Sequence, residues 1–522
     1  MQQMEQGEKG GQQESAELDI YGYAEPINLT SMMMEDSLSV TDASYTLEDN
    51  PYVNLYKEHG MNVTYKLSGM SGDVSTKLDM AITTGDIPDI MQVSATQFRE
   101  LSEAGLLADL SEAYETYASE ELRARVEADG GLMMQNGYVD GQLLCLAPAS
   151  GYHDYIGVVA LRSDWMEECG LTEPTTMDEL WKIAETFKEK NMDGTCTIGM
   201  SMTKDVTTLL RPTINLLNAY HAYVNIWLEK DGEVVNSVIQ PELKEALGIL
   251  ADKYAAGLID PEFGSKGYDE MCEDAIAGRT GVVVADFCIP FRLVNGVTNG
   301  QEWVYYAVPS NDGQVVKFQE SVAFNGGVAV SADCEHPEAV IKMMNLFVKY
   351  SVEDMETYGS NGVNNYAYPT NIGAPNANEK TYAYYMEALQ ASPDDVITHV
   401  TEAGGDGNVV SSVEAAEKWR VDGDTDGYIM WAVFGENSTE AYVTEAVEKD
   451  AFQVSVYTGS TTDTMETYNA TLNTMIEQMI TNIITGTKPI EYFDEFVSNW
   501  KANGGDRITE EVNEWYRQQS AN

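Results

Sequence analysis

The sequence predicts an α/β fold arranged in more than one domain, and three observations support this prediction. The chain has 522 residues, which is more than a single ordinary core accommodates. Short strand patterns alternate with helical patterns in the order β-α-β-α-β over residues 18–93. Hydrophobic residues make up 43% of the chain and aromatic residues 10%, which is enough for well-packed cores.

The first five elements alternate between strand and helix. The three predicted strands are Leu18–Tyr23, Val63–Leu67 and Ile90–Val93. Between the first two strands, Asn50 and Pro51 begin a helix as its N-cap and its first helical residue. This helix ends at Gly60, and the helix after the second strand ends at Gly85.

Such an open sheet predicts where a ligand binds. Ligands of α/β sheets lie beyond the carboxyl ends of the strands. The predicted strands therefore point to three short segments as candidates. These segments are Tyr23–Glu25, Ser68–Met70 and Ser94–Thr96.

The middle of the chain continues with both kinds of element. We expect a hairpin at Gly137–Pro148, strands at Val158–Arg162, Gly281–Ala285 and Val328–Val330, and helices around Leu180–Phe187, Leu243–Tyr254 and Val340–Phe347. Thr176 and Glu179 have the spacing of a capping box at the start of the first of these helices. Because Gly281–Ala285 is continuously apolar, we expect it to be buried on both faces in a sheet centre.

The last third of the chain combines an irregular segment with helices. Ser360–Asn378 is rich in Asn, Gly, Pro and Tyr and shows no period, which indicates a long loop. Apolar residues then recur at helical spacing in three segments close to the C-terminus. These predicted helices are centred on residues 468–483, 490–500 and 508–515.

Acidic residues greatly outnumber basic residues. The chain has 85 Asp and Glu against 30 Lys and Arg, and its formal net charge is −55. A field of this sign repels polyphosphates and anionic lipids, so we exclude nucleic acid and membrane surfaces as partners. The charge favours solubility, and it favours neutral or cationic ligands over anionic ones.

The cysteines indicate neither a zinc site nor a disulfide framework. They are Cys145, Cys169, Cys196, Cys272, Cys288 and Cys334. No two form a C-x-x-C pair, and their spacing fits no zinc site. Several lie among apolar or helical residues, where a free buried thiol is expected, so we predict no structural disulfides.

The N-terminus has the composition of a flexible tether. Residues 1–17 are rich in Gln, Gly, Glu and Ser and cannot bury a core. No run of 18 apolar residues occurs anywhere, and no export signal is visible. A cytoplasmic protein and a mature segment behind a new Met are both consistent with this, and the tether favours the second.

A series of short motifs in a particular order resembles one protein family. In chain order they are Gly85–Ile90, Gly105–Leu110, Tyr138–Gln142, Leu161–Trp165, Gly170–Leu171, Pro174–Thr176, Gly257–Pro261, His336–Val340, Tyr492–Asp494, Trp500–Lys501, Gly504–Asp506 and Glu514–Tyr516. Each motif alone is weak, whereas their order and spacing are specific. The chain resembles the extracellular solute-binding proteins of bacterial ABC importers, in the carbohydrate-type, lipoprotein-like group of family 1.

This resemblance implies a two-lobe, periplasmic-binding-protein-like fold with a hinge and a cleft between the lobes. From the family's topology, we expect lobe 1 at 18–150 plus about 310–350, and lobe 2 at 151–309 plus about 351–522. The resemblance further implies a monomer that delivers its ligand to a membrane permease. Members are usually tethered to the cell surface by a lipidated N-terminal cysteine. This sequence has no such cysteine, so we expect the anchor to lie outside it.

A sugar ligand requires particular side chains. It offers hydroxyls and an apolar ring face, which carboxylates, amides and aromatic planes recognise. Position along the chain selects candidates of these types. They are Tyr23, Glu25, Tyr152, His153, Asp154, Tyr155, Trp227, Asp286, Phe287, Tyr366, Tyr368 and Trp431. For each aromatic residue, packing in a core is an equally weighted alternative to stacking on ligand.

One acidic loop resembles the start of a calcium-binding loop. Asp422, Asp424 and Asp426 alternate with Gly423, Thr425 and Gly427, but the twelfth position is Val433 where an EF-hand has Glu. An acidic surface turn is therefore the favoured interpretation, and a calcium site is the alternative. We expect no other cofactor.

The motifs of common enzymes are absent. The sequence has no H-E-x-x-H, G-x-S-x-G, Walker or G-x-G-x-x-G pattern, so we predict a binding protein without catalytic residues. Three alternatives stay open. They are a peptide- or amino-acid-binding protein of the same fold, a carbohydrate-active enzyme such as a glycoside hydrolase, and a surface protein for adhesion or signalling.

Overall fold

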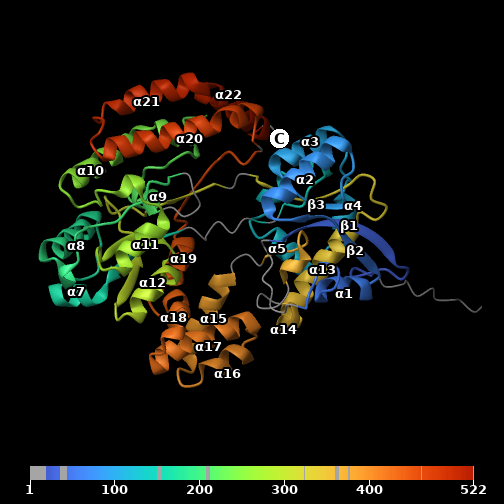
Figure 1. Ribbon diagram of the computed structural model, residues 1–522, viewed down its shortest axis with the longest axis horizontal. Helices are drawn as coiled ribbons and strands as arrows, with labels where there is room; N and C mark the ends of the chain where they lie inside the picture. Colours follow the sequence, from blue (N-terminus) through green and yellow to red (C-terminus); the bar gives the residue numbers. More distant parts are fainter. Residues whose placement is uncertain are drawn as a thin grey trace, which may run out of the picture.

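The chain folds into two bodies that lie side by side and are joined by crossing segments (Figure 1). The computed structural model describes residues 19–35, 44–147, 149, 156–206, 212–321, 324–358, 364–373, 377–459 and 461–520. We call the body that contains the N-terminal strands lobe 1 and the other lobe 2. The predicted α/β architecture with two lobes is confirmed. The predicted tether, residues 1–17, lies outside the described residues.

Lobe 1 contains two longer pairs of strands and one short hairpin, with helices on either side. Its strands are β1 (Ile27–Met34), β2 (Met61–Gly69), β3 (Ile90–Ser94), β4 (Tyr138–Val139), β5 (Gln142–Leu143) and β12 (Gly326–Val330). Its helices are α1 (Pro51–Glu58), α2 (Ser71–Thr84), α3 (Ala95–Glu103), α4 (Ser111–Tyr117), α5 (Glu120–Val126), α6 (Leu132–Gln135), α13 (Ala339–Glu353) and α14 (Met355–Tyr358). β1 pairs with β2 in parallel, and β3 pairs with β12 antiparallel. The pairs are linked because Thr30 and Asp89 exchange hydrogen bonds of 2.7 and 2.9 Å.

The prediction for the first strand was wrong, and those for the following elements are confirmed. β1 begins at Ile27, after the predicted strand Leu18–Tyr23 has ended. The Asp19 carboxylate accepts hydrogen bonds from the backbone N–H groups of Tyr21 and Gly22, so these residues form a turn. α1, β2, α2, β3 and the β4–β5 hairpin lie where the sequence predicts them.

The core of lobe 1 draws on distant parts of the sequence. Buried side chains of β1, β2 and α1 pack against those of α13, which lies about 300 residues later. Tyr366, within the short 3-10 helix η5 (Asn364–Ala367), and Ile372, which follows this helix, also pack in this core. We expected residues after about 350 in lobe 2, so part of the predicted loop belongs to lobe 1 instead.

Lobe 2 contains a small antiparallel sheet surrounded by helices. The strands of this sheet are β6 (Gly157–Arg162), β9 (Val282–Asp286) and β10 (Trp303–Ala307). Lobe 2 also contains a separate pair, β7 (Trp227–Lys230) and β8 (Glu233–Asn236). Around the sheet lie α7 (Ser163–Cys169), α8 (Met177–Lys190), α9 (Pro212–Asn218), α10 (Pro241–Ala255), α11 (Tyr268–Ile276) and α12 (Ile289–Thr298). The sheet order is β10-β6-β9.

The predicted place of β9 in a sheet centre was therefore wrong. β6 is the central strand, and β9 pairs with it from one side only. All five residues of β9 are nevertheless buried. A parallel bridge between Ser201 and Val283 covers part of its other edge, so burial did not require a further full strand.

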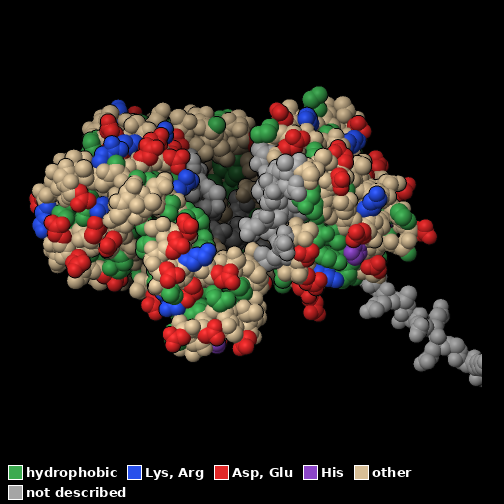
Figure 2. Space-filling model, turned by 60° about the horizontal axis from the view of Figure 1, so that its bottom comes forward, with side chains coloured by type: hydrophobic (Ala, Val, Ile, Leu, Met, Phe, Trp, Pro, Cys, Tyr) green, Lys and Arg blue, Asp and Glu red, His purple; other side chains and the backbone are tan. Residues whose placement is uncertain are grey.

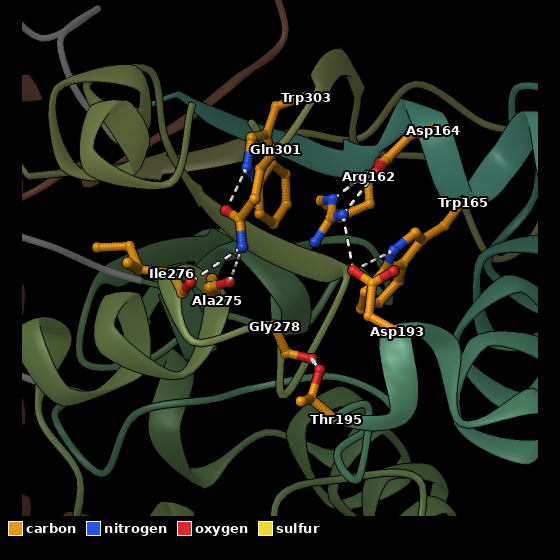
Figure 3. Close-up of polar contacts among 10 residues, drawn as sticks. All are labelled: Arg162, Asp164, Trp165, Asp193, Thr195, Ala275, Ile276, Gly278, Gln301 and Trp303. Atoms are coloured by element: carbon orange, nitrogen blue, oxygen red, sulfur yellow. Dashed lines mark hydrogen bonds and ion pairs between the residues drawn. The ribbon is translucent and has the colours of Figure 1, made fainter. Parts of the chain in front are cut away.

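A polar cluster holds the outer end of lobe 2, where β6 leads into α7. The buried Arg162 guanidinium donates to Asp164 at 2.8 and 2.5 Å and to Asp193 at 3.0 Å, and it lies 4.3 Å from the centre of the Trp165 ring (Figure 3). Trp165 Nε1 also donates to Asp193, at 3.0 Å. The resemblance motif Leu161–Trp165 thus has a structural role.

Two groups of helices complete lobe 2. The first, which we call the helical subdomain, contains α15 (Ala377–Ala391), α16 (Val396–Glu402), α17 (Gly407–Asp422), α18 (Tyr428–Phe434) and α19 (Thr439–Glu448). The second contains α20 (Asp463–Ile484), α21 (Tyr492–Trp500) and α22 (Asp506–Ser520). The three C-terminal helices are confirmed. Among the described residues, every helix is too short or too polar to cross a membrane.

The cap of α8 differs from the predicted capping box in one bond. The Thr176 hydroxyl accepts from Glu179 N at 3.2 Å, as expected. The Glu179 carboxylate accepts from the backbone and hydroxyl of Thr175 at 2.7 and 2.8 Å, one residue earlier than the box requires. No disulfide joins any of the six cysteines, all of which lie among the described residues.

The lobes are connected by segments that pass from one core to the other. Phe318 packs in the core of lobe 2 and Phe324 in that of lobe 1. Strands β11 (Phe318–Glu320) and β13 (Phe452–Val454) pair in parallel beside this crossing. Phe452 lies against the core of lobe 2 and Val454 against that of lobe 1, so these strands form the joint between the lobes.

Candidate functional site

Strand ends from both lobes meet at the joint. In lobe 1, β3 ends at Ser94, which pairs with Gly326, the first residue of β12. In lobe 2, β9 ends at Asp286, which pairs with Gly157, the first residue of β6. Figure 2 shows a hollow between the two lobes. The carboxyl ends of β3 and β9 thus lie beside the crossing segments, where a shared ligand would contact both lobes.

Two glycines allow the close backbone approach at these strand starts. Gly326 has a φ of 108°, and a Cβ atom there would lie 1.9 Å from the carbonyl oxygen of Val93. A Cβ atom on Gly157 would lie 2.8 Å from side-chain atoms of Asn215 and Phe318. Larger side chains would therefore displace the strands that set the edge of the site.

Asp286 is positioned by a local hydrogen-bond network. It is 1% exposed, and its carboxylate accepts from the Tyr268 hydroxyl and the Cys288 backbone N–H, both at 2.9 Å. Burial, followed by the adjacent Asp286 carboxylate, raises the pKa of Tyr268. Phe287 is 7% exposed and packs in the core of lobe 2. Both residues lie at the predicted strand end, and their present contacts are within the protein.

Sequence reasoning missed an exposed aromatic residue beside this strand end. Phe291, in the first turn of α12, is 44% exposed. In lobe 1, Met70 directly follows β2 and is 56% exposed, within the segment Ser68–Met70 that the sequence had selected. Exposed large apolar side chains at strand ends suit an apolar ring face. The signal for Phe291 was its position five residues after Asp286.

Tyr23 and Glu25 lie before β1, so the prediction that they follow the first strand was wrong. The Tyr23 hydroxyl donates to Glu338 at 2.8 Å, and its ring lies 4.2 Å from Lys342 Nζ. Burial and the bond to Glu338 raise the pKa of Tyr23. These contacts bind the N-terminal segment to α13, at the amino end of β1. Glu25 is exposed there.

The remaining described aromatic candidates are spread over the molecule. Trp227 is 8% exposed in the core of lobe 2, and Tyr366 is 2% exposed in the core of lobe 1. Tyr368 is half-buried near the latter. Trp431 is half-buried in the helical subdomain, with its ring edge-to-face to Tyr385 at 6.4 Å. The structure does not gather these side chains into one cluster with Asp286.

Four further candidates lie in the first crossing segment. Tyr152, His153, Asp154 and Tyr155 fall outside the described residues. The chain enters that segment from Ala147 in the core of lobe 1 and leaves it at Ile156 in the core of lobe 2. Their contribution to ligand binding stays a prediction.

The acidic loop runs from Asp422, the last residue of α17, through the 3-10 helix η6 (Thr425–Gly427) into α18. The Asp424 carboxylate accepts from the Asp426 backbone N–H at 3.1 Å, and the side chains of Asp422, Asp424 and Asp426 are exposed. Within the described part of the chain, no three His, Cys, Asp or Glu side chains are grouped so as to hold a metal ion. The turn interpretation accounts for the contacts that this loop makes.

Two lobes on a common joint, with strand ends of both beside that joint, define a two-lobed binding protein. The chain belongs to the family of bacterial extracellular solute-binding proteins, whose model matches residues 43–351. The family membership that the sequence motifs indicated is thereby confirmed.

Individual relatives are distant. The chain is similar to Lipoprotein LipO of Bacillus subtilis (strain 168), with 22% identity over 456 residues and 84% of each chain covered. It is 20% identical over 458 residues to the polygalacturonan/rhamnogalacturonan-binding protein YtcQ of the same organism, which covers 85% of this chain and 83% of YtcQ. Its fold is similar to that of the alginate-binding protein AlgQ2, with a TM-score of 0.59 and 15% identity over 95% of this chain and 99% of AlgQ2.

Proposed function

We propose that this protein is the solute-capturing component of an ABC importer and that its solute is a sugar or oligosaccharide. The observation that carries the proposal is the pair of strand ends, from two lobes of a solute-binding protein, beside the segments that join the lobes. Two relatives support a saccharide: YtcQ is named for polygalacturonan and rhamnogalacturonan, and AlgQ2 for alginate. Exposed Phe291 and Met70 supply apolar surface for a sugar ring.

In this proposal the ligand acts by closing the lobes. A ligand that contacts both strand ends binds the closed form more tightly than the open form, and it shifts the equilibrium by that difference. The permease then recognises the closed shape and accepts the ligand. Asp286 stays bound to Tyr268 and orients the turn into α12, which carries Phe291.

Several further features belong to the same proposal. The chain acts as a monomer, is tethered outside the cell by a lipid, and leaves the bonds of its ligand intact. A partial calcium site at Asp422–Asp426 remains a hypothesis, and AlgQ2 was crystallised in a form without calcium ion. Adding calcium or EDTA during thermal unfolding tests that hypothesis, because an occupied site raises the melting temperature.

A thermal unfolding screen followed by calorimetry tests the proposed function. We expect one or more oligosaccharides to raise the melting temperature, whereas peptides and amino acids do not. Chromatography of the incubated sugar should show it unchanged. A rise with peptides alone would indicate the peptide-binding alternative, and new sugar products would indicate an enzyme.

A further inference from the structure

A second cavity lies between lobe 1 and the helical subdomain of lobe 2. Its volume is about 830 Å³, within the range of small-molecule sites. α5 and α13 supply one wall, and α15 and α17 supply the other, which lies across the gap between the lobes in Figure 1. None of its lining residues comes from a strand, so it is built independently of the strand ends described above.

The lining of this cavity departs from the charge balance of the chain. Three cations line it, namely Arg125, Lys349 and Lys380. Three acidic residues also line it, whereas the whole chain has 85 acidic residues against 30 basic ones. One of the three, Asp406, uses Oδ1 to accept the first backbone N–H groups of α17 at 2.9 and 3.1 Å. All three acidic residues are exposed.

The three cations are not held in close ion pairs, although the nearby Asp406 carboxylate favours the charge of Arg125. Within the part of the chain that the structure describes, none of Arg125, Lys349 and Lys380 forms an ion pair, although acidic residues are abundant. Arg125 is half-buried, and its Nη1 donates to the carbonyl oxygen of Ile372 at 2.8 Å. Burial lowers its pKa, which reflects the cost of holding this charge away from water. An anion in the cavity would offset that cost.

The same cavity presents surface for a ring. The half-buried Tyr21 lines it, and Lys349 Nζ lies 4.7 Å from the centre of the Tyr21 ring. Val352 is 44% exposed beside it, and Asn371 adds an amide. A small inorganic anion would leave this surface unused. A pyranose ring that carries a carboxylate matches both the cations and the apolar wall.

We propose that this cavity is a subsite for a carboxylate-bearing unit of an extended saccharide ligand. The inference rests on the proposed sugar-binding function and specifies its ligand as an acidic oligosaccharide. Arg125 pairs with the carboxylate through its fork of N–H groups, and Lys349 and Lys380 neutralise its charge. Because the walls belong to different lobes, a unit bound here also stabilises their closed arrangement.

Calorimetry with matched neutral and acidic sugars tests the proposal. The probes are tetrasaccharides of galacturonate, guluronate and mannuronate, each beside the same tetrasaccharide with its carboxyl groups reduced to alcohols. We expect at least one acidic probe to bind about tenfold more tightly than its reduced counterpart. Arg125→Gln and Lys380→Gln should each weaken that probe about fivefold to tenfold and leave the reduced one within about twofold.

The neighbouring arginine of α5 supplies a matched control. Arg123 donates to the carbonyl oxygens of Tyr114 and Glu115, both at 2.9 Å, and does not line the cavity. Arg123→Gln should leave both affinities unchanged. The side chain of Lys380 makes no hydrogen bond or ion pair with the described residues, so Lys380→Gln keeps the test valid if Arg125→Gln disturbs the fold.

Three outcomes would overturn the subsite. Equal binding of every acidic probe and its reduced counterpart would reject it and leave the proposed sugar-binding function standing. Binding of acetate or monomeric galacturonate with the same dependence on Arg125 would assign the cavity to free organic acids. If no saccharide raised the melting temperature in the unfolding screen, both the proposed function and the subsite would be rejected.

Discussion

Arg162 illustrates how a buried charge is held in a protein with few cations. Its side chain is 4% exposed, and two carboxylates and the face of Trp165 surround it (Figure 3). The Asp193 side chain is 53% exposed and so remains partly hydrated while it binds the arginine. This arrangement fixes the turn between β6 and α7 at the outer end of lobe 2, far along β6 from Gly157 at the joint.

Replacing Arg162 should destabilise the protein strongly. Arg162→Ala removes the guanidinium and leaves the Trp165 Nε1–Asp193 pair as the remaining polar contact of the cluster. We expect the free energy of unfolding in urea to fall by about 3 kcal/mol. The control is Arg507→Ala, because Arg507 is 68% exposed and meets Glu511 at 3.5 Å. If Arg162→Ala lowered the free energy of unfolding by no more than Arg507→Ala does, the cluster would not support the fold.

Burial decides which aromatic residues are available to a ligand. The type of a residue does not predict whether its side chain is buried. Trp227 and Phe291 are both large and aromatic, yet they are 8% and 44% exposed. The sequence selected Trp227 by its residue type and its position along the chain. Its burial arises from β7 and β8, whose packing against distant helices sets the core of lobe 2. Local patterns do not encode such contacts.

At the scale of elements, helix α10 carries a glycine that its fold does not require. Gly248 lies in the interior of the helix, and a Cβ atom there would meet only Ile490 Cδ1, at 4.0 Å. Gly248→Ala should therefore raise the free energy of unfolding by about 0.5–1 kcal/mol, through higher helix propensity. Urea unfolding measures the change.

The opposite result is expected at the start of β12. Gly326→Ala would place a methyl group against the Val93 carbonyl in a backbone conformation that favours glycine. We expect a loss of more than about 1 kcal/mol by the same measurement. If Gly326→Ala lost no stability, the close approach of β3 and β12 would be in doubt.

A second element-scale feature is a polar bridge between α3 of lobe 1 and the first turn of α20. Arg99 donates to Thr461 O at 2.9 Å and to Glu466 at 3.1 Å, and Thr96 donates to Glu466 at 2.7 Å. Further along α20, Leu472 and Ile476 are buried in the core of lobe 2. The helix therefore links the lobes through side chains at one end and a core at the other.

Acidification should loosen this bridge. The hydrogen bond from Thr96 and the contact with Arg99 lower the pKa of Glu466 from its ordinary value of 4.5. The charged Glu466 carboxylate thus stabilises the bridge fully above pH 4.5. This contribution is lost as the pH falls through the lowered pKa of Glu466. The distance between spin labels at exposed Met80 and Val421, in different lobes, should become more broadly distributed at such a pH.

A matched variant separates this effect from general acid unfolding. Glu466→Gln should show the broad distance distribution at neutral pH and little further change on acidification. Wild-type protein and the variant should converge at low pH. An unchanged distribution in Glu466→Gln at neutral pH would mean that the bridge does not restrain the lobes.

At the scale of the whole molecule, ligand binding should change the shape of the chain. We expect the radius of gyration from small-angle X-ray scattering to decrease when a sugar that raises the melting temperature is added to saturation. The lobes are joined by a few crossing segments and the β11–β13 pair, which permits rotation. An unchanged radius with a bound sugar would contradict closure.

The overall charge and the local charge lead to different expectations for the ligand. A net charge of −55 repels anions at a distance and favours neutral or cationic ligands. Beyond the Debye length of about 8 Å in physiological salt, however, this repulsion is largely screened. The cavity between the lobes is lined by Arg125, Lys349 and Lys380 together with three acidic residues, so the acidic excess of the whole chain is absent there. Ligand charge is therefore decided by the arrangement of side chains, which the sequence composition does not reveal.

The sequence by itself determined the class of fold, the family and part of the regular elements, including α1, α2, α8, α10, α13 and the three C-terminal helices. Caps such as Asn50, stop residues such as Gly85 and apolar stripes act within a few residues, so they are readable along the chain. Only the tertiary structure decided that β9 lies beside β6 alone, that Tyr23 binds α13, and which cations share a cavity. These properties depend on contacts between residues hundreds of positions apart, whose partners local patterns do not specify.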